Sequence, residues 1–268
     1  MQKHELNKDF AWHDHAGPFR AVSDEQARQY DRDGFFVMED AFEPELVDSL
    51  LAELDPLEAE FEKFLREKLG GKAFIARADE ITFNAHVILR SPLARSFTHD
   101  PVFCGLAHDL LGADVRLYWD QTVYKKPGAP ERFPWHQDNG YTYVEPQQYL
   151  TCWVALTDTD EESGCPVLAP GVHRGGTLAH EVTDLGFQCF AEAPAEAVSV
   201  PLRAGSIAVF SSLTPHMTGP NLSADRERKA YIVQYAPDGA ETLRAGVRTR
   251  CDAPDRQYPI LVNGQPPA

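Results

Sequence analysis

The stretch VRLYWDQTVYKK, residues 115–126, decides the fold class, because it is long, rich in β-branched and aromatic residues and closed by a Pro-Gly turn. This composition is typical of a β-strand. Shorter runs of the same character follow, separated by loops that contain Gly or Pro: Thr151–Thr157, Val167–Leu168, Val198–Leu202, Ser206–Phe210 and Ala230–Tyr235. Several short strands without helices between them predict an antiparallel sandwich or jelly roll and argue against a parallel α/β sheet.

The residues before this region are helical in character. Ser23 can cap a helix that runs toward Tyr30, because its hydroxyl can accept a hydrogen bond from a free backbone N–H group. Gly34–Met38 then predicts a short buried strand. Pro44–Lys68 carries leucine and phenylalanine at the three- and four-residue spacings of an amphipathic helix, which Pro56 could interrupt.

No break in composition marks a linker, so we expect one domain spanning residues 1–268. Its fold class would be mainly β with flanking helices: a helical layer mostly in residues 1–114, packed on a β core mostly in residues 115–240. A chain of 268 residues with 43% hydrophobic content can bury a core of this size.

The charge balance narrows the classes of partner. The chain has 41 acidic and 25 basic residues and a formal net charge of -16, so it repels nucleic-acid backbones and anionic lipid surfaces. We therefore expect no nucleic-acid and no membrane partner. A local basic pocket could still bind a small anionic molecule, because net charge says nothing about one cleft.

The five cysteines are scattered and contain no C-x-x-C pair, which argues against a disulfide framework and a cysteine-rich zinc site. A reducing cytoplasm fits this pattern best. The first ten residues contain no apolar signal-peptide core, and no apolar run approaches the roughly 18 residues needed to span a bilayer. The sequence therefore predicts a soluble, cytoplasmic protein.

A metal site is predicted by the segment FPWHQDNGY, residues 133–141. His136 and Asp138 are two residues apart, so on an extended strand an imidazole and a carboxylate project from the same face. His216, a few residues beyond the strand at Ser206–Phe210, is the best third ligand. Two histidines and one carboxylate are the facial triad of non-haem Fe(II) oxygenases. Three protein ligands leave two positions for a chelating 2-oxoacid and one for dioxygen.

A basic residue follows at a suitable place. Arg228 leads into the apolar run Ala230–Tyr235, and an arginine fork suits the distal carboxylate of 2-oxoglutarate. Each part also has a simpler explanation. His-x-Asp arises by chance in many exposed loops, and His216 alone could be a hydrogen-bonded loop histidine. The combination favours an oxygenase over these explanations.

An ordered series of short segments covers most of the chain: Asp33–Val37, Tyr124–Gly128, His136–Asp138, Trp153–Asp158, Ser163–Pro166, Pro170–His173, Gly205–Phe210, His216–Asn221 and Arg228–Ala230. This series resembles the phytanoyl-CoA dioxygenase family. The resemblance implies a double-stranded β-helix, a cupin-like jelly roll, with an N-terminal helical layer. It implies an Fe(II)- and 2-oxoglutarate-dependent dioxygenase that uses O2 to hydroxylate an unactivated C–H bond of a small organic substrate, releasing succinate and CO2.

The resemblance also assigns roles to individual residues. The metal ligands would be His136, Asp138 and His216. The residues that contact 2-oxoglutarate would be Arg228, Thr218, Trp153 and Thr122.

Two departures from the family pattern matter. The stretch between His216 and Arg228 is about one residue longer than usual, which makes Arg226 a rival for the carboxylate-binding role. His173 stands in a Pro-Gly-Val-His loop where Pro-Gly-Ser-His is typical, and we expect it to order that loop. Asp138 is present, whereas related halogenases have a small residue there, so a halogenase is not expected.

The substrate pocket is harder to predict. On the strand before the Pro-Gly turn, the even-numbered residues share one face that could line the cavity: Asp120, Thr122, Tyr124 and Lys126. Polar and aromatic residues around the metal segment could also contact substrate: Gln137, Asn139, Tyr141 and Tyr143. The tyrosines could equally be half-buried sheet residues. His86 is the other histidine that could reach the pocket.

Two other functions stay open. One is a catalytically idle binding protein on the same scaffold. The other is a metal-dependent hydrolase or a cupin-type dioxygenase that works without 2-oxoglutarate. The scaffold is compatible with an acyl-CoA, an amino acid, a compatible solute, a phosphonate or a secondary metabolite as substrate. It is also compatible with outcomes other than hydroxylation, and no pattern predicts the oligomeric state.

Overall fold

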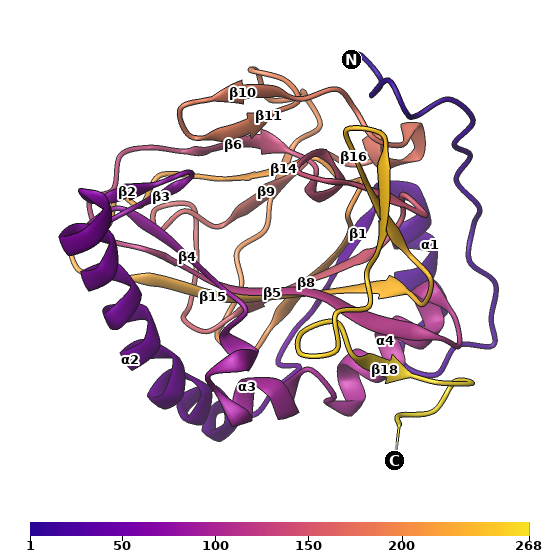
Figure 1. Cartoon of the computed structure of the whole chain (residues 1–268), viewed down its shortest axis with the longest axis horizontal. Coiled ribbons are helices and arrows are strands. Elements are labelled where there is room, and N and C mark those ends of the chain that lie inside the picture. The colour runs from indigo at the N-terminus through magenta and orange to yellow at the C-terminus, as the bar shows by residue number, and fades with distance from the viewer. Residues whose placement is uncertain (268) are drawn as a thin grey trace.

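The computed structural model describes residues 1–267 and places two antiparallel β-sheets face to face (Figure 1). The larger sheet has the strand order β1-β13-β8-β15-β5-β4-β3-β2, with β18 also paired to β5. Its strands are β1 (Phe35–Met38), β2 (Lys72–Ala73), β3 (Ala76–Arg77), β4 (Ile81–Ala85), β5 (Val115–Lys125), β8 (Leu150–Ala155), β13 (Ile207–Ser211), β15 (Arg228–Pro237) and β18 (Pro259–Leu261). The smaller sheet has the order β12-β9-β14-β6, formed by β6 (Phe133–His136), β9 (Pro166–Leu168), β12 (Val198–Ser199) and β14 (His216–Thr218).

Two small sheets lie beyond this pair. One is the hairpin of β10 (Glu181–Thr183) and β11 (Gly186–Gln188); the other joins β7 (Tyr143–Glu145), β16 (Glu241–Arg244) and β17 (Val247–Arg250). The strand runs expected from the sequence all contain strands, although the run at Val198–Leu202 forms only the two-residue β12. Strands before residue 115 and after residue 240 extend the β structure beyond the expected range.

Helices cover the outer face of the larger sheet (Figure 1). They are α1 (Asp24–Asp33), α2 (Pro44–Leu69), α3 (Pro92–Phe97) and α4 (Pro101–Leu111), with short 3-10 turns η1 (Val87–Leu89), η2 (Asp138–Gly140) and η3 (Val172–Gly175). Ser23 caps α1 as expected, because its hydroxyl accepts from the Gln26 backbone N–H while the Gln26 side chain accepts from the Ser23 backbone. None of the helices in residues 1–267 is both long enough and apolar enough to cross a bilayer.

Helix α2 continues through Pro56, so the expected interruption is wrong. Pro56 lies on the exposed side of α2, where the carbonyl that loses its partner can bind water. Leu50 and Leu54 lie on the opposite side and are fully buried in the main core between the helices and the larger sheet. This burial holds both halves of α2 against the same sheet.

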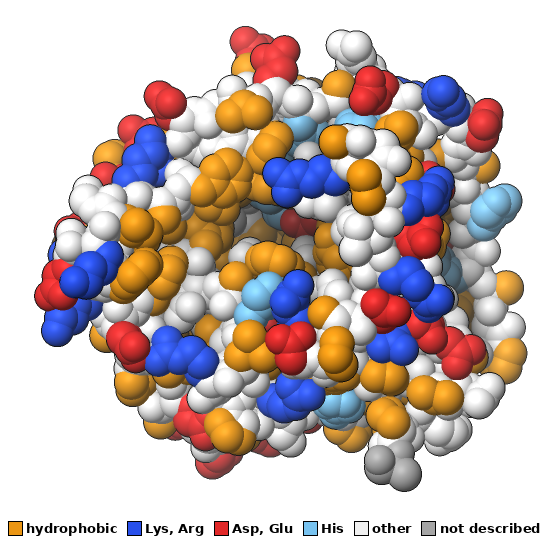
Figure 2. Space-filling view, viewed as in Figure 1, with side chains coloured by type: hydrophobic (Ala, Val, Ile, Leu, Met, Phe, Trp, Pro, Cys, Tyr) orange, Lys and Arg blue, Asp and Glu red, His pale blue; other side chains and the backbone are white. Residues whose placement is uncertain are grey.

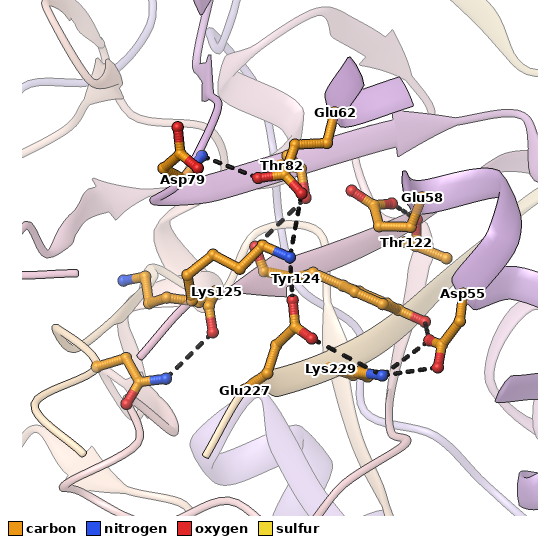
Figure 3. Close-up of polar contacts among 12 residues, drawn as sticks. Asp55, Glu58, Glu62, Asp79, Thr82, Thr122, Tyr124, Lys125, Glu227 and Lys229 are labelled. Atoms are coloured by element: carbon orange, nitrogen blue, oxygen red, sulfur yellow. Dashed lines mark hydrogen bonds and ion pairs between the residues drawn. The ribbon is translucent and has the colours of Figure 1, made fainter. Parts of the chain in front are cut away.

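Polar contacts also join α2 to the larger sheet (Figure 3). Asp55 accepts hydrogen bonds from Lys229 Nζ at 2.8 and 2.9 Å and from Tyr124 Oη at 2.8 Å. One turn further along the helix, Glu58 accepts a hydrogen bond of 2.8 Å from Thr122 Oγ1. Charged side chains on a helix therefore replace part of the apolar packing that usually joins a helix to a sheet.

The same network continues toward the end of α2. Lys126 Nζ lies 3.2 Å from a Glu62 carboxylate oxygen and 2.6 Å from Glu227 Oε1. Glu227 directly precedes β15, so this ion pair holds the start of that strand near the helix (Figure 3). The side chains in these ion pairs are only partly exposed. Solvent therefore screens them less than it screens ion pairs on the open surface.

Glu58 is the least solvated member of the network. Its side chain is 2% exposed, and its Oε1 has no hydrogen-bond partner within residues 1–267. Burial raises the pKa of this carboxyl above its ordinary value, and the nearby Thr82 hydroxyl and the hydrogen bond from Thr122 offset only part of the shift.

Replacing Glu58 with Gln should raise the melting temperature at pH 8 by about 2–4 °C, and the gain should vanish near pH 4. Because the folded-state pKa is raised, the folded protein binds this proton more tightly than the unfolded chain. Wild-type stability therefore falls as the pH rises from the ordinary carboxyl value through the raised one. Thermal unfolding from pH 4 to pH 8 measures the difference. Glu67→Gln, an exposed carboxylate of the same helix, is the control. A pH profile of Glu58→Gln parallel to that of wild type would contradict this account.

Candidate active site

The pairing of β6 with β14 brings two histidines together. His216 lies directly opposite His136 in the register of these strands, and their ring centroids are 4.2 Å apart. Backbone extended through Gln137 places Asp138 at the start of η2, with its Oδ1 3.9 Å from His136 Nε2 and 3.7 Å from His216 Nε2. One ligand atom from each of these three side chains lies within 4.8 Å of the others. The structure thus brings the three residues predicted as metal ligands to one point.

Both histidines present Nε2 to this point. His136 Nδ1 lies 2.8 Å from the Pro134 carbonyl oxygen, and His216 Nδ1 lies 3.0 Å from that of Thr214. A carbonyl can only accept, so each Nδ1 carries a proton, and in the neutral ring that leaves Nε2 with the lone pair. Burial, helped by the neighbouring His216, holds the pKa of His136 well below its ordinary value. Neutral imidazoles with free Nε2 atoms are the form that binds a metal ion.

A hydrogen-bonded chain orients the carboxylate. Thr151 Oγ1 donates to Asp138 Oδ2 at 2.6 Å, and Gln234 Nε2 donates to Thr151 Oγ1 at 3.2 Å. This leaves Oδ1 of Asp138 facing the two histidines. The sequence predictions missed Thr151 and Gln234, although alternation along the strands points to them. Thr151 is two residues from Trp153, and Gln234 is an even number of residues from Arg228.

The turn after His136 is fixed by structural contacts. A Cβ on Gly140 would lie 2.1 Å from the His180 ring, so only glycine allows this close approach. Asn139 donates to Thr177 Oγ1 at 2.7 Å and accepts from the Val144 backbone N–H at 2.9 Å. The Gln137 side chain donates to two backbone carbonyls and accepts from one backbone N–H.

The expectation that Gln137 and Asn139 contact substrate is therefore wrong. Both side chains are 0% exposed and bind the loops around the turn. Tyr141 does line the cavity, with its ring 5.2 Å from the His136 ring, and Tyr143 also reaches the cavity wall.

A buried cation lies in the same cavity. Arg228, the first residue of β15, is 0% exposed, and none of its three guanidinium nitrogens has a hydrogen-bond partner among residues 1–267. Burial lowers its pKa to about 10, so it is still charged at neutral pH. The Trp153 ring lies 5.4 Å from the guanidinium carbon, and Thr218 lines the same cavity. A desolvated charge without a partner is costly unless an anion binds it.

Lys125 adds a second basic group beside it. Lys125 is opposite Arg228 in the register of β5 and β15, is 1% exposed, and donates to the carbonyl oxygens of Glu131 and Gly219. Burial, followed by repulsion from Arg228, lowers its pKa to about 6. Lys125 connects the end of β5 to the residue that follows β14. The sequence predictions did not include it.

The structure places the two rival arginines, Arg226 and Arg228, in different surroundings. Arg226 lies outside the cavity and forms ion pairs of 2.7 Å with Asp160 and 2.5 Å with Glu162. Arg228 is the arginine that faces the cavity. His173 is fully buried, with its Nε2 3.2 Å from the Asp31 carbonyl oxygen, which agrees with the loop-ordering role expected for it.

The expected cavity face of β5 is wrong by one residue. Asp120 binds Tyr231 Oη and a backbone N–H on the helix side, where the side chains of Thr122, Tyr124 and Lys126 also lie. The residues of β5 that line the cavity are Tyr118, Trp119, Gln121 and Val123. The register explains this result, because Lys125 is paired with Arg228 and shares its face. Neither Thr122 nor His86 lines the cavity.

The cavity itself has a volume of about 1010 Å³ and opens on the face seen in Figure 2. The metal-ligand candidates and the 2-oxoglutarate candidates that line it are His136, Asp138, His216, Arg228, Thr218 and Trp153. The site therefore combines three side chains that could hold a metal ion and one buried cation without a hydrogen-bond partner among residues 1–267 in a single chamber.

Comparison with known proteins identifies relatives of this arrangement. The phytanoyl-CoA dioxygenase family matches residues 30–230. An ectoine dioxygenase of Bordetella parapertussis is 32% identical over 168 residues, which are 58% of this chain and 50% of that protein. The phytanoyl-CoA dioxygenase of Arabidopsis thaliana is 28% identical over 173 residues, 62% of this chain and 61% of that one. The match thus spans about half the length of the first relative and less than two thirds of the second.

Among solved structures, the non-haem α-ketoglutarate-dependent carbocyclase SnoK from nogalamycin biosynthesis superposes with a TM-score of 0.66. It is 28% identical, and the match covers 94% of this chain and 97% of that one. The fold is the jelly roll that the sequence predicted. The family match covers most of the chain, so this protein belongs to the phytanoyl-CoA dioxygenase family.

Proposed function

We propose that this chain is an Fe(II)- and 2-oxoglutarate-dependent dioxygenase that hydroxylates a C–H bond of a small organic molecule and releases succinate and CO2. One observation carries the proposal. A fully buried Arg228 without a hydrogen-bond partner in residues 1–267 faces the same cavity as a His-Asp-His cluster. An ion site alone would not need that cation.

The three ligand side chains fit Fe(II). Two neutral imidazoles and one carboxylate on one side of an ion match the facial triad of non-haem iron enzymes. His136, Asp138 and His216 would hold the metal through two Nε2 atoms and Oδ1. The opposite side of the ion would face the open cavity, where a chelating cosubstrate and dioxygen can bind.

Arg228 fits the far carboxylate of 2-oxoglutarate. A guanidinium fork can make two parallel hydrogen bonds to a carboxylate, and both are strong in a site without water. Burial and the nearby Arg228 lower the pKa of Lys125 to about 6, so Arg228 carries the full positive charge at this end of the cavity at neutral pH. Thr218 and Trp153 lie on the walls beside it, where a hydroxyl donor and an aromatic face could contact the bound anion.

When bound, Fe(II) and 2-oxoglutarate supply the oxidation, in which one oxygen atom of O2 enters succinate and the other enters the substrate. The protein's residues then need only hold and orient. Thr151 and Gln234 fix the carboxylate, the backbone carbonyls fix both imidazoles, and the walls exclude water. No acid–base pair is required.

The names of the relatives support the reaction class. One is a dioxygenase and one is α-ketoglutarate-dependent, although the latter is a carbocyclase. A hydrolase that works without 2-oxoglutarate would leave Arg228 with no role in catalysis. Product analysis would distinguish hydroxylation from ring formation by the same site.

Replacing Arg228 with Met should weaken 2-oxoglutarate binding on the order of 100-fold, because two charge-assisted hydrogen bonds are lost. The measurement is anaerobic titration of the Fe(II)-loaded protein with 2-oxoglutarate, following the visible charge-transfer band of the chelate. Arg226→Met removes only two ion pairs outside the cavity and should leave the titration unchanged. If wild type binds Fe(II) but gives no band, the 2-oxoglutarate assignment is wrong.

Replacing Thr151 with Val should weaken Fe(II) binding about 10- to 100-fold, because Asp138 Oδ2 loses its hydrogen-bond donor and the carboxylate can rotate. Thr151→Ser keeps the hydroxyl and should restore nearly wild-type affinity. Anaerobic competition with a chromogenic chelator gives the dissociation constants. Equal affinities for the Val and Ser variants would exclude this orienting role.

A further inference from the structure

The cavity is larger than the cosubstrate needs. At the density of water, about 30 Å³ per non-hydrogen atom, the ten such atoms of 2-oxoglutarate fill about 300 Å³. Roughly 700 Å³ of the cavity's 1010 Å³ remains, within the range of pockets for drug-sized ligands, about 300–1000 Å³. A compact compatible solute of similar atom count would leave most of this space empty.

Aromatic rings run from the metal centre to the mouth of the cavity. The His136 ring is 5.2 Å from Tyr141, Tyr141 is 4.9 Å from Phe187, and Phe187 is 6.0 Å from Phe74. A second row joins His136 to Phe133 at 5.0 Å and continues to another phenylalanine of β4. Rings in edge-to-face contact leave other faces and edges free. These can pack against a ring of a molecule bound beside the row.

Phe74 at the end of the first row is unusual. It lies in the turn between β2 and β3, is 60% exposed, and has a left-handed backbone with φ of 49°. A bulky residue with positive φ is strained, and exposing its ring to water adds no stability. Ile75 beside it also lines the cavity. The turn therefore presents two apolar side chains at the mouth in a conformation that the fold alone does not favour.

The opposite side of the mouth is basic. Arg244 and Arg248 come from the β16–β17 hairpin and line the cavity. Arg248 pairs with Glu241 at 3.1 Å, whereas Arg244 forms no ion pair with any of residues 1–267. Figure 2 shows hydrophobic side chains gathered on one side of the hollow and Lys or Arg side chains on the other.

Few charges lie deep in the cavity. Across residues 1–267, the Asp, Glu, Lys and Arg residues of the lining are Glu5, Asp138, Arg228, Arg244 and Arg248. In the proposed function, Asp138 binds the metal and Arg228 binds the cosubstrate. A phosphonate or zwitterion held near the metal would then have no second counter-charge at that depth.

We infer that the substrate is a bulky, ring-bearing and largely apolar molecule with an acidic group, held by the aromatic rows with its acidic end at Arg244. The inference rests on the proposed function, because oxidation would occur at the end of the aromatic rows that lies beside His136. It deepens that function by selecting one substrate class from those the scaffold permits.

Two fluorescent probes test the inference on the Fe(II)- and 2-oxoglutarate-loaded protein without oxygen. 8-Anilinonaphthalene-1-sulfonate has fused rings and an acidic group, and N-phenyl-1-naphthylamine has the rings alone. Wild type should bind one sulfonate probe per chain. Phe74→Ala should weaken both probes about three- to tenfold, and Arg244→Gln should weaken the sulfonate alone about two- to fivefold.

The controls match each variant. Phe64→Ala removes an exposed ring of α2 outside the cavity, and Arg28→Gln removes an exposed arginine of α1; both should bind the probes like wild type. Undiminished binding to Phe74→Ala overturns the inference, as does displacement of the probe by ectoine, a compact zwitterion, at equal concentration. The chelate band of the same sample reports the proposed function separately. A band without probe binding refutes the substrate class alone, and probe binding without a band refutes the proposed function.

Discussion

The pairing of His216 with His136 across two antiparallel strands is the constraint on which the site depends. Residues directly opposite in such a pair have Cβ atoms about 4.5–5.5 Å apart, so the register alone sets two imidazoles side by side. Strand β14 cannot slide, because it also pairs with β9 on its other side. A slip of one residue would turn the His216 imidazole to the opposite face of the sheet. Once the two histidines are fixed, a single short turn places Asp138.

Charge distribution on β15 links this chamber to the helices outside it. Glu227 and Lys229 flank Arg228 and reach the network on α2 (Figure 3). Arg228 itself is buried and lines the cavity. Alternation along a strand makes this division unavoidable. The outer ion pairs hold the start of the strand, and the inner arginine lacks any carboxylate partner within residues 1–267. The fold thus keeps one uncompensated positive charge in a place where only a small anion can reach it.

Sequence patterns predicted the strands and the three side chains that the structure brings together as a His-Asp-His cluster, because both depend on local chemistry: β-rich runs and a His-x-Asp pair on extended backbone. They failed on the face of β5. Period-two alternation grouped Asp120 with Thr122 correctly, but both faces of this strand are covered, one by helices and one by the cavity. Polar residues occur on both, so polarity does not identify the inner face. The register with β15 decides it, and register is a property of two distant segments. The prediction that Gln137 and Asn139 contact substrate was wrong for a different reason. Polar residues beside the candidate metal ligands can form hydrogen bonds to neighbouring loops instead of to a bound molecule.

The residues at the mouth of the cavity could not be predicted from the sequence, for a related reason. Phe74 and Arg244 belong to hairpins with strands of two to four residues, too short to give a periodic pattern. Both line the same cavity only because the sheets bring distant loops to one rim. These side chains are exposed and add little to the core, whereas the metal-centre residues are buried and tied by hydrogen bonds. Substitutions at the rim can therefore change which molecule enters while the geometry around His136 stays the same. Such a separation would let one fold carry different activities, in keeping with relatives whose names are as different as an ectoine dioxygenase and a carbocyclase.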